Sequence, residues 1–117
     1  MTERIESNSD HGHFFTSMLA GQASRWRWAP GIDFTFNEER IGWGVALSIE
    51  YQFQRPGLFA SALAKRFQEA MDYEGCYLCL DGGETFIVWH AVQEECRDLT
   101  SLQRIINRLL ELAGLHH

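Results

Sequence analysis

The sequence has few basic residues, few cysteines and no long apolar run. Its ten lysines and arginines are outnumbered by sixteen aspartates and glutamates, giving a formal net charge of −6. Nucleic-acid binding depends on neutralising phosphates, so this balance argues against a nucleic-acid partner. No apolar stretch approaches the roughly 20 residues that a membrane helix needs, which argues against a membrane protein. Three cysteines, an odd number, indicate a reduced compartment rather than a disulfide framework.

The sequence also lacks the motifs that usually reveal catalytic and metal sites. It has no G-x-S-x-G turn, no H-E-x-x-H helix and no Gly-rich phosphate loop between a strand and a helix. Cys76 and Cys79 have C-x-x-C spacing, but in a strand an offset of three places the two thiols on opposite faces. His90 lies in an apolar segment, where a packed histidine is commoner than a metal ligand. We therefore expect no enzyme, no cofactor and no metal site.

The 117 residues, 45% of them apolar, suffice for one domain with a packed core. The polar opening MTERIESNSDHGH lacks the apolar core of a signal peptide. We expect residues 1–9 to be a flexible end and residues 10–115 to form a single cytoplasmic domain.

Hydrophobic periodicity predicts the secondary structure. Apolar residues recur with helical spacing in some segments and at every second position in others. The alternation at every second position continues without interruption through residues 41–53. These residues therefore form either one bent strand or two. The turn sequence Asp81-Gly82-Gly83-Glu84 predicts a hairpin. The fold class is α+β, an α-β-β(β)-α-β-β-α sandwich with an antiparallel sheet flanked by helices. Helices are expected over 10–23, 58–73 and 99–113, and strands over 32–37, 41–53, 76–80 and 85–92.

Residues 24–31, SRWRWAPG, alternate two arginines with two tryptophans. Interleaved cations and aromatics can bind nucleic acid by contacting phosphates and stacking on bases. A strand or extended segment gives the same pattern, because alternation sends the tryptophans to one face and the arginines to the other. The acidic net charge favours the second interpretation. We expect Trp28 to pack at the sheet edge, Trp26 to be wholly or partly exposed, and Arg25 and Arg27 to face solvent or an acidic partner.

The chain has more aromatic and aliphatic side chains than a small sheet and three helices need, and its last helix is apolar on more than one face. This surplus predicts a protein-binding module, since large aromatic side chains supply much of the energy of protein interfaces. The alternative for several of these aromatics is a place in the core. The predicted partner-binding residues are Phe14, Phe15, Trp26, Trp28 and Trp43.

The segments to compare are the opening helix with Phe14, Phe15 and Leu19, IDFTFNEERIGWGVALSIE, LFASALAKRFQEAM, CYLCLDGGETFIVWHAV and LTSLQRIINRLLELA. Their order, the small size of the chain and its acidic pI resemble the class I chaperone family of bacterial type III secretion systems. The resemblance implies a homodimer joined through the middle helix that binds an extended segment of a secreted effector along apolar patches and sheet edges. A smaller branch of that family consists of regulators of the Hrp secretion systems of plant pathogens, which bind a transcriptional activator or another chaperone-like protein.

The middle helix carries an apolar stripe that either packs on the sheet or joins two copies of the chain. The resemblance favours a dimer interface formed by Phe59, Leu63, Phe67 and Met71. The main expectation is a non-enzymatic module that binds a secreted effector or a regulatory protein of the secretion system. The alternative is a regulator that controls transcription of secretion genes by protein–protein binding. A small enzyme and a nucleic-acid binder are weaker alternatives.

Overall fold

The computed structural model describes residues 2–115, with side chains from residue 11 onward. Short 3₁₀ turns, Tyr51–Phe53 and Glu94–Cys96, precede the second and third helices. The predicted α+β class is confirmed, and the additional strand before the middle helix comes from residues 24–29 rather than from a division of 41–53. The elements are α1 (Thr2–Ala20), β1 (Ser24–Ala29), β2 (Ile32–Glu39), β3 (Gly42–Ile49), α2 (Leu58–Gln68), β4 (Cys76–Leu80), β5 (Phe86–Ala91) and α3 (Leu99–Leu112).

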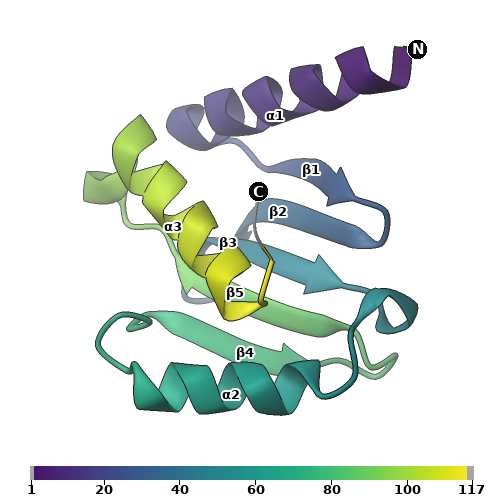
Figure 1. Ribbon diagram of the computed structural model, residues 1–117. Coiled ribbons are helices and arrows are strands. Elements are labelled where there is room, and N and C mark those ends of the chain that lie inside the picture. The colour runs from purple at the N-terminus through teal and green to yellow at the C-terminus, as the bar shows by residue number, and fades with distance from the viewer. Residues whose placement is uncertain (1, 116–117) are drawn as a thin grey trace.

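The five strands form one antiparallel sheet in the order β1-β2-β3-β5-β4, so that β1 and β4 are its edges (Figure 1). Side chains alternate between the two faces of each strand. The register places one row of apolar residues across the whole sheet on the face that the helices cover. This row consists of Trp26, Phe34, Leu47, Val88 and Leu78.

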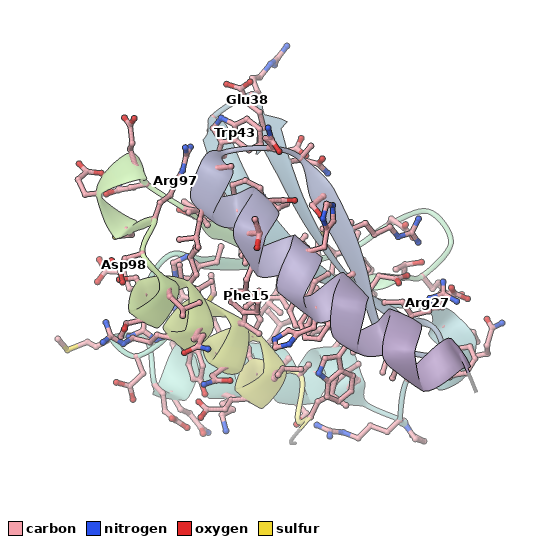
Figure 2. All side chains as sticks on the ribbon, turned by 90° about the horizontal axis from the view of Figure 1, so that it is seen from above. Phe15, Arg27, Glu38, Trp43, Arg97 and Asp98 are labelled. Atoms are coloured by element: carbon pink, nitrogen blue, oxygen red, sulfur yellow. The ribbon has the colours of Figure 1, made fainter. Side chains whose placement is uncertain are left out.

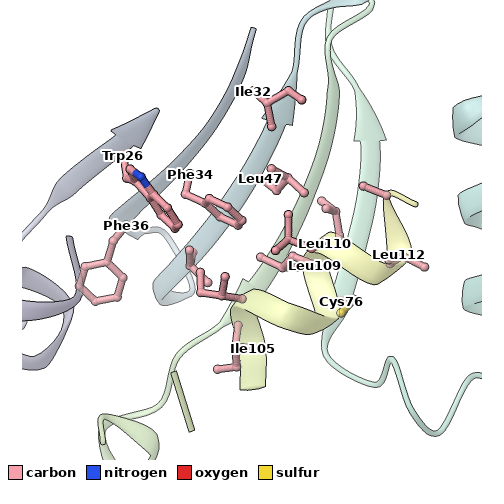
Figure 3. Close-up of a cluster of buried hydrophobic side chains, with 14 of the residues drawn as sticks. Trp26, Ile32, Phe34, Phe36, Leu47, Cys76, Ile105, Leu109, Leu110 and Leu112 are labelled. Atoms are coloured by element: carbon pink, nitrogen blue, oxygen red, sulfur yellow. The ribbon is translucent and has the colours of Figure 1, made fainter. Parts of the chain in front are cut away.

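All three helices contribute to a core on this covered face. Leu109 and Leu110 of α3 point toward Phe34 and Leu47 of the sheet (Figure 3). α1 supplies Phe14, whose ring centroid lies 6.3 Å from that of Phe34. The surplus apolar residues of α3 are buried as well, because α3 contacts α1 and α2 in addition to the sheet. The expectation that part of α3 remains open for a partner is therefore wrong. The buried residues of α3 are Leu102, Ile105, Ile106, Leu109, Leu110 and Leu112.

Three element boundaries differ by several residues from the predicted ones, and the other differences are smaller. α1 begins at Thr2 rather than near residue 10, so residues 2–9 of the expected flexible end have a helical backbone. α2 ends at Gln68, and the turns that follow it bury Tyr73. β3 ends at Ile49 although the apolar alternation continues to Phe53. Ile49 pairs with the first residue of β2, so the chain beyond it has no β2 residue to pair with, and it turns into the 3₁₀ segment.

Candidate partner-binding surfaces

Trp26 projects from β1 into the core and is only 8% exposed. Its indole stacks on Phe34, with ring centroids 5.3 Å apart, and lies 5.8 Å from Phe14. Trp28 is half-buried against the edge of the same core. The predicted exposure of Trp26 is therefore wrong. The pairing of β1 with β2 shifts register between Arg27 and Ala29, so Trp28 lies at an irregularity where the alternation of faces is interrupted.

The two arginines of β1 point to the other face of the sheet and share one carboxylate. Arg25 Nη2 lies 3.0 Å from Asp33 Oδ2, and Arg27 Nε lies 3.1 Å from Asp33 Oδ1. Asp33 is buried, whereas both arginine side chains are more than half exposed. The hydrogen bond and the charge of Asp33 raise the pKa of Arg27 above its ordinary value. The acidic group that these arginines face is therefore in their own chain, where it fastens β1 to β2.

A groove of about 330 Å³ runs between α1 and α3. Phe15 and Trp26 line it, and the His11 ring lies 4.7 Å from Trp26 and 5.0 Å from Phe15. Phe15 lies where the two helices approach each other (Figure 2). We call this feature the α1–α3 groove. It is lined by His11, Phe15, Trp26, Gln103, Ile106 and Asn107.

Trp43 belongs to a separate aromatic contact at the start of β3. Its ring stacks on Phe36, with centroids 4.9 Å apart. The guanidinium carbon of Arg97 lies 5.7 Å from the Trp43 ring centroid, a cation–π distance (Figure 2). Arg97 Nε is buried without a hydrogen-bond partner among the described residues. Trp43 is thus held between two side chains of its own chain and does not continue the α1–α3 groove.

α2 exposes its apolar stripe. Phe67 is 85% exposed and Met71, in the turn after the helix, is 91% exposed, while Leu63 is exposed to a smaller extent. Phe59, at the start of the stripe, is half-buried, and its ring centroid lies 6.3 Å from that of Phe86. We call Leu63, Phe67 and Met71 the α2 stripe. Phe59 packs on the sheet, so of the four predicted interface residues these three are the ones open to another chain.

A second groove, of about 490 Å³, lies where the 3₁₀ turn, the start of α2 and the end of β4 meet. Gln54 fixes it, because its side-chain amide donates to the carbonyls of Ile49 and Glu84, both at 2.8 Å. Tyr51 and Leu80 line it and are exposed. The sequence did not reveal this site, because the alternation through residues 41–53 predicts buried strand positions rather than a turn.

The whole chain matches the model of a known protein family. The model of the HrpV-like family matches residues 1–117. The chain belongs to the HrpV-like family. No curated protein matches the chain significantly. The predicted resemblance to the chaperone-like proteins of type III secretion, which include the Hrp regulators, is confirmed by this membership.

The fold of this HrpV-like chain is also found among solved structures. It matches a chain in the structure of the heterodimeric complex ExoU-SpcU from the type III secretion system of Pseudomonas aeruginosa, with a TM-score of 0.53 and 18% sequence identity. The match covers 79% of this chain and 77% of that chain. At this identity the match establishes the fold, which agrees with the predicted secretion-chaperone architecture.

The predicted partner-binding residues of the HrpV-like chain do not form one surface. Phe14, Phe15 and Trp26 come together where α1 packs on β1, with Phe14 fully buried and the other two at the floor of the α1–α3 groove. They do not form an exposed aromatic surface with Trp28 and Trp43, which corrects the predicted placement. None of the helices in residues 2–115 is long and apolar enough to cross a membrane.

Proposed function

We propose that this HrpV-like protein is a non-enzymatic, cytoplasmic, chaperone-like regulator of type III secretion that binds another protein of the secretion system. Its partner is a regulatory protein or a secreted effector. The match of the family model to all 117 residues is the observation that carries the proposal. The fold shared with a chain of a heterodimeric type III secretion complex supports it.

The geometry favours a protein as the partner over a small substrate or nucleic acid. Among the described residues, no group of three or more His, Cys, Asp and Glu side chains could hold a metal ion. Residues 24–31 offer little to nucleic acid, because Trp26 is buried and both arginines of β1 are paired with Asp33. The burial of Trp26 and the pairing of the two arginines argue against the alternative of a nucleic-acid binder.

The α1–α3 groove is the best site for an apolar side chain of the partner. Its floor is aromatic, with Phe15 and Trp26 held in place by the core beneath them, and its α3 wall carries the amides of Gln103 and Asn107. A rigid apolar floor with polar groups at its rim is the usual composition of a protein-binding pocket. The α2 stripe lies elsewhere and is left for a second copy of the chain, as the family resemblance implies.

The groove can be tested by filling it without disturbing the core. Asn107 lines the groove and is exposed, so Asn107→Arg should leave folding unchanged and hinder access. Thr16→Arg, on an exposed position of α1 outside the groove, is a matched control with the same change in charge. The measurement is the affinity for purified regulatory and effector proteins encoded in the same secretion gene cluster, with melting curves recorded on the same samples.

We expect Asn107→Arg to weaken binding about tenfold or more, which corresponds to about 1.4 kcal/mol, whereas Thr16→Arg binds like the wild type. Equal binding by the two variants would move the partner site away from this groove. If none of the regulatory and effector proteins binds the wild type, the proposed function itself is wrong.

A further inference from the structure

The outer side of α3 carries two arginines that no other described residue binds. Arg104 and Arg108 lie four residues apart, so their side chains project from the same side of the helix. Arg104 is exposed and Arg108 is half-buried. Among the residues whose side chains are described, neither arginine has a hydrogen-bond or ion-pair partner, since both ion pairs there involve Asp33.

The internal structure of the protein gives the two arginines of α3 no evident role. Five of the other arginines are engaged by their own chain: two are paired with Asp33, two donate to backbone carbonyls and one lies over Trp43. Like charges at i and i+4 of a helix repel each other, so Arg104 and Arg108 do not stabilise α3 as a pair. The last turn of α3, where a cation would offset the helix dipole, has no basic residue. Both guanidinium groups are therefore available to a carboxylate of another molecule.

The two arginines line a depression of about 470 Å³ that adjoins the α1–α3 groove. Gln103 and Asn107 line both the depression and the groove, so these two side chains lie between them. α1 lies along one side of α3 (Figure 2), and the depression is on the outer side of α3. We call this depression the arginine site. It is lined by Thr100, Gln103, Arg104, Asn107, Arg108 and Glu111.

The ionisable side chains along the two grooves are mostly basic, although the chain as a whole is acidic. They are His11 in the α1–α3 groove and Arg104, Arg108 and Glu111 in the arginine site. Glu111 forms no ion pair with either arginine. At physiological ionic strength, charges farther apart than about 8 Å are largely screened from each other. A molecule bound on α3 is therefore affected by these arginines more than by the net charge of −6.

We propose that the arginine site binds an acidic segment of the partner protein, and that an apolar side chain of the same segment occupies the α1–α3 groove. This inference rests on the proposed function and specifies the chemistry of the partner. Arginine suits the role because its planar guanidinium can donate two parallel hydrogen bonds to one carboxylate. An apolar residue flanked by carboxylates fills both grooves at once, because the grooves share Gln103 and Asn107.

Nucleic acid is also negatively charged, but it fits this surface less well. A DNA duplex carries one negative charge for about every 1.7 Å of its axis. A bound duplex would therefore extend past the two arginines onto the remainder of an acidic protein. Its phosphate backbone also has no apolar side chain for the α1–α3 groove. An acidic protein segment meets both conditions.

Charge reversal at Arg104 can be compared with a control of equal net charge. Arg40, in the turn between β2 and β3, is exposed like Arg104 and also lacks a hydrogen-bond or ion-pair partner among the described side chains. Arg104→Glu and Arg40→Glu therefore change the net charge equally and remove no such internal contact. The measurement is the dissociation constant for purified regulatory and effector proteins encoded in the same secretion gene cluster, with melting curves recorded on the same samples. It is made at about 0.1 M and about 1 M salt, where charges are screened beyond about 10 Å and about 3 Å.

At the lower salt concentration we expect Arg104→Glu to bind at least about tenfold more weakly than Arg40→Glu, because a carboxylate at position 104 repels the acidic segment. The ratio of the two dissociation constants should shrink at the higher salt concentration, because screening weakens this repulsion. Equal binding by the two variants would overturn the inference and leave the proposed function standing. A ratio that does not change with salt would assign the loss to shape rather than charge and would also overturn it. If none of the proteins binds the wild type, the proposed function and this inference are both wrong.

Two further comparisons identify which part of the surface fails and which class of molecule binds. Asn107→Arg fills the α1–α3 groove while adding a positive charge, so a loss of affinity in that variant reports the groove and not the arginine site. Titration of labelled duplex DNA at the lower salt concentration tests the nucleic-acid alternative. We expect no DNA binding at protein concentrations that saturate the partner. DNA binding that Arg104→Glu abolishes and Arg40→Glu preserves would assign the arginines to nucleic acid and would overturn the inference.

Discussion

The β1 end and the β4 end of the sheet differ in how completely the chain covers its own residues. At the β1 end, Trp26 is buried among aromatic rings and Asp33 is paired with two arginines. At the β4 end, Phe67 is almost fully exposed, and His90 Nε2 is buried without a hydrogen-bond partner among the described residues. The chain therefore completes its own packing at the β1 end. It leaves the β4 end as the surface where association can gain free energy.

The largest expected effect is at the β1 end. Trp26→Ala removes a buried indole that contacts Phe14 and Phe34, and the rings around it cannot close the space completely. We expect the free energy of unfolding to fall by about 3–5 kcal/mol, measured by urea denaturation. Tyr77→Ala, which truncates an exposed aromatic residue on the other edge strand, serves as the control and should have a much smaller effect. A Trp26→Ala variant as stable as the wild type would contradict the burial of this residue.

The burial of Trp26 could not be predicted from the sequence. The alternation in SRWRWAPG correctly separates the arginines from Trp26, but it gives Trp26 and Trp28 the same face and does not say which one the helices cover. The irregularity after Arg27 and the position of α1 decide this, and both depend on contacts between distant segments. A local period carries no information about them.

Most element positions could be predicted, because they follow from local patterns. The strand Cys76–Leu80 and the start of α3 at Leu99 have the predicted bounds, and Cys76 and Cys79 lie on opposite faces as expected. The end of β3 could not be predicted, because it depends on where β2 begins. The exposure of Phe67 was also out of reach, since an amphipathic stripe has the same spacing whether it faces the core or a second chain.

A smaller effect is expected at the β4 end, and it depends on pH. His90 Nδ1 lies 2.6 Å from the carbonyl oxygen of Ala91, so Nδ1 carries the hydrogen and Nε2 is left as a buried acceptor. Burial lowers the pKa of His90 below its ordinary 6.5, the charge of Arg108 lowers it further, and the hydrogen bond to Ala91 opposes the change. The thiol of Cys76 lies opposite His90 on β4, and burial raises its pKa, so it offers no negative charge near neutral pH.

Because the unfolded chain takes up the proton more readily than the folded one, the contribution of His90 to stability is present at neutral pH. It is lost as the pH falls below about 6.5. One side chain accounts for at most about 1.4 kcal/mol per pH unit. We expect His90→Gln to lose less stability than the wild type between pH 7 and pH 5, measured by urea denaturation at each pH. Parallel pH profiles for the two proteins would show that His90 is not held neutral by the fold.

Phe67→Ser should have the smallest effect on the stability of the single chain, although Phe67 is as apolar as the core phenylalanines. In dilute solution, where association is negligible, Phe67 contacts mostly water, so its replacement should change the free energy of unfolding by no more than about 0.5 kcal/mol. Gln68→Ser, at the neighbouring exposed position, is the control for loss of helix propensity.

At higher concentration the wild type should gain stability through association, because a second copy binds only the folded chain. The melting temperature of the wild type should therefore rise with concentration while that of Phe67→Ser stays constant. A large loss in dilute solution would place Phe67 in the core, and a wild-type melting temperature independent of concentration would mean that the β4 end is not completed by a second copy.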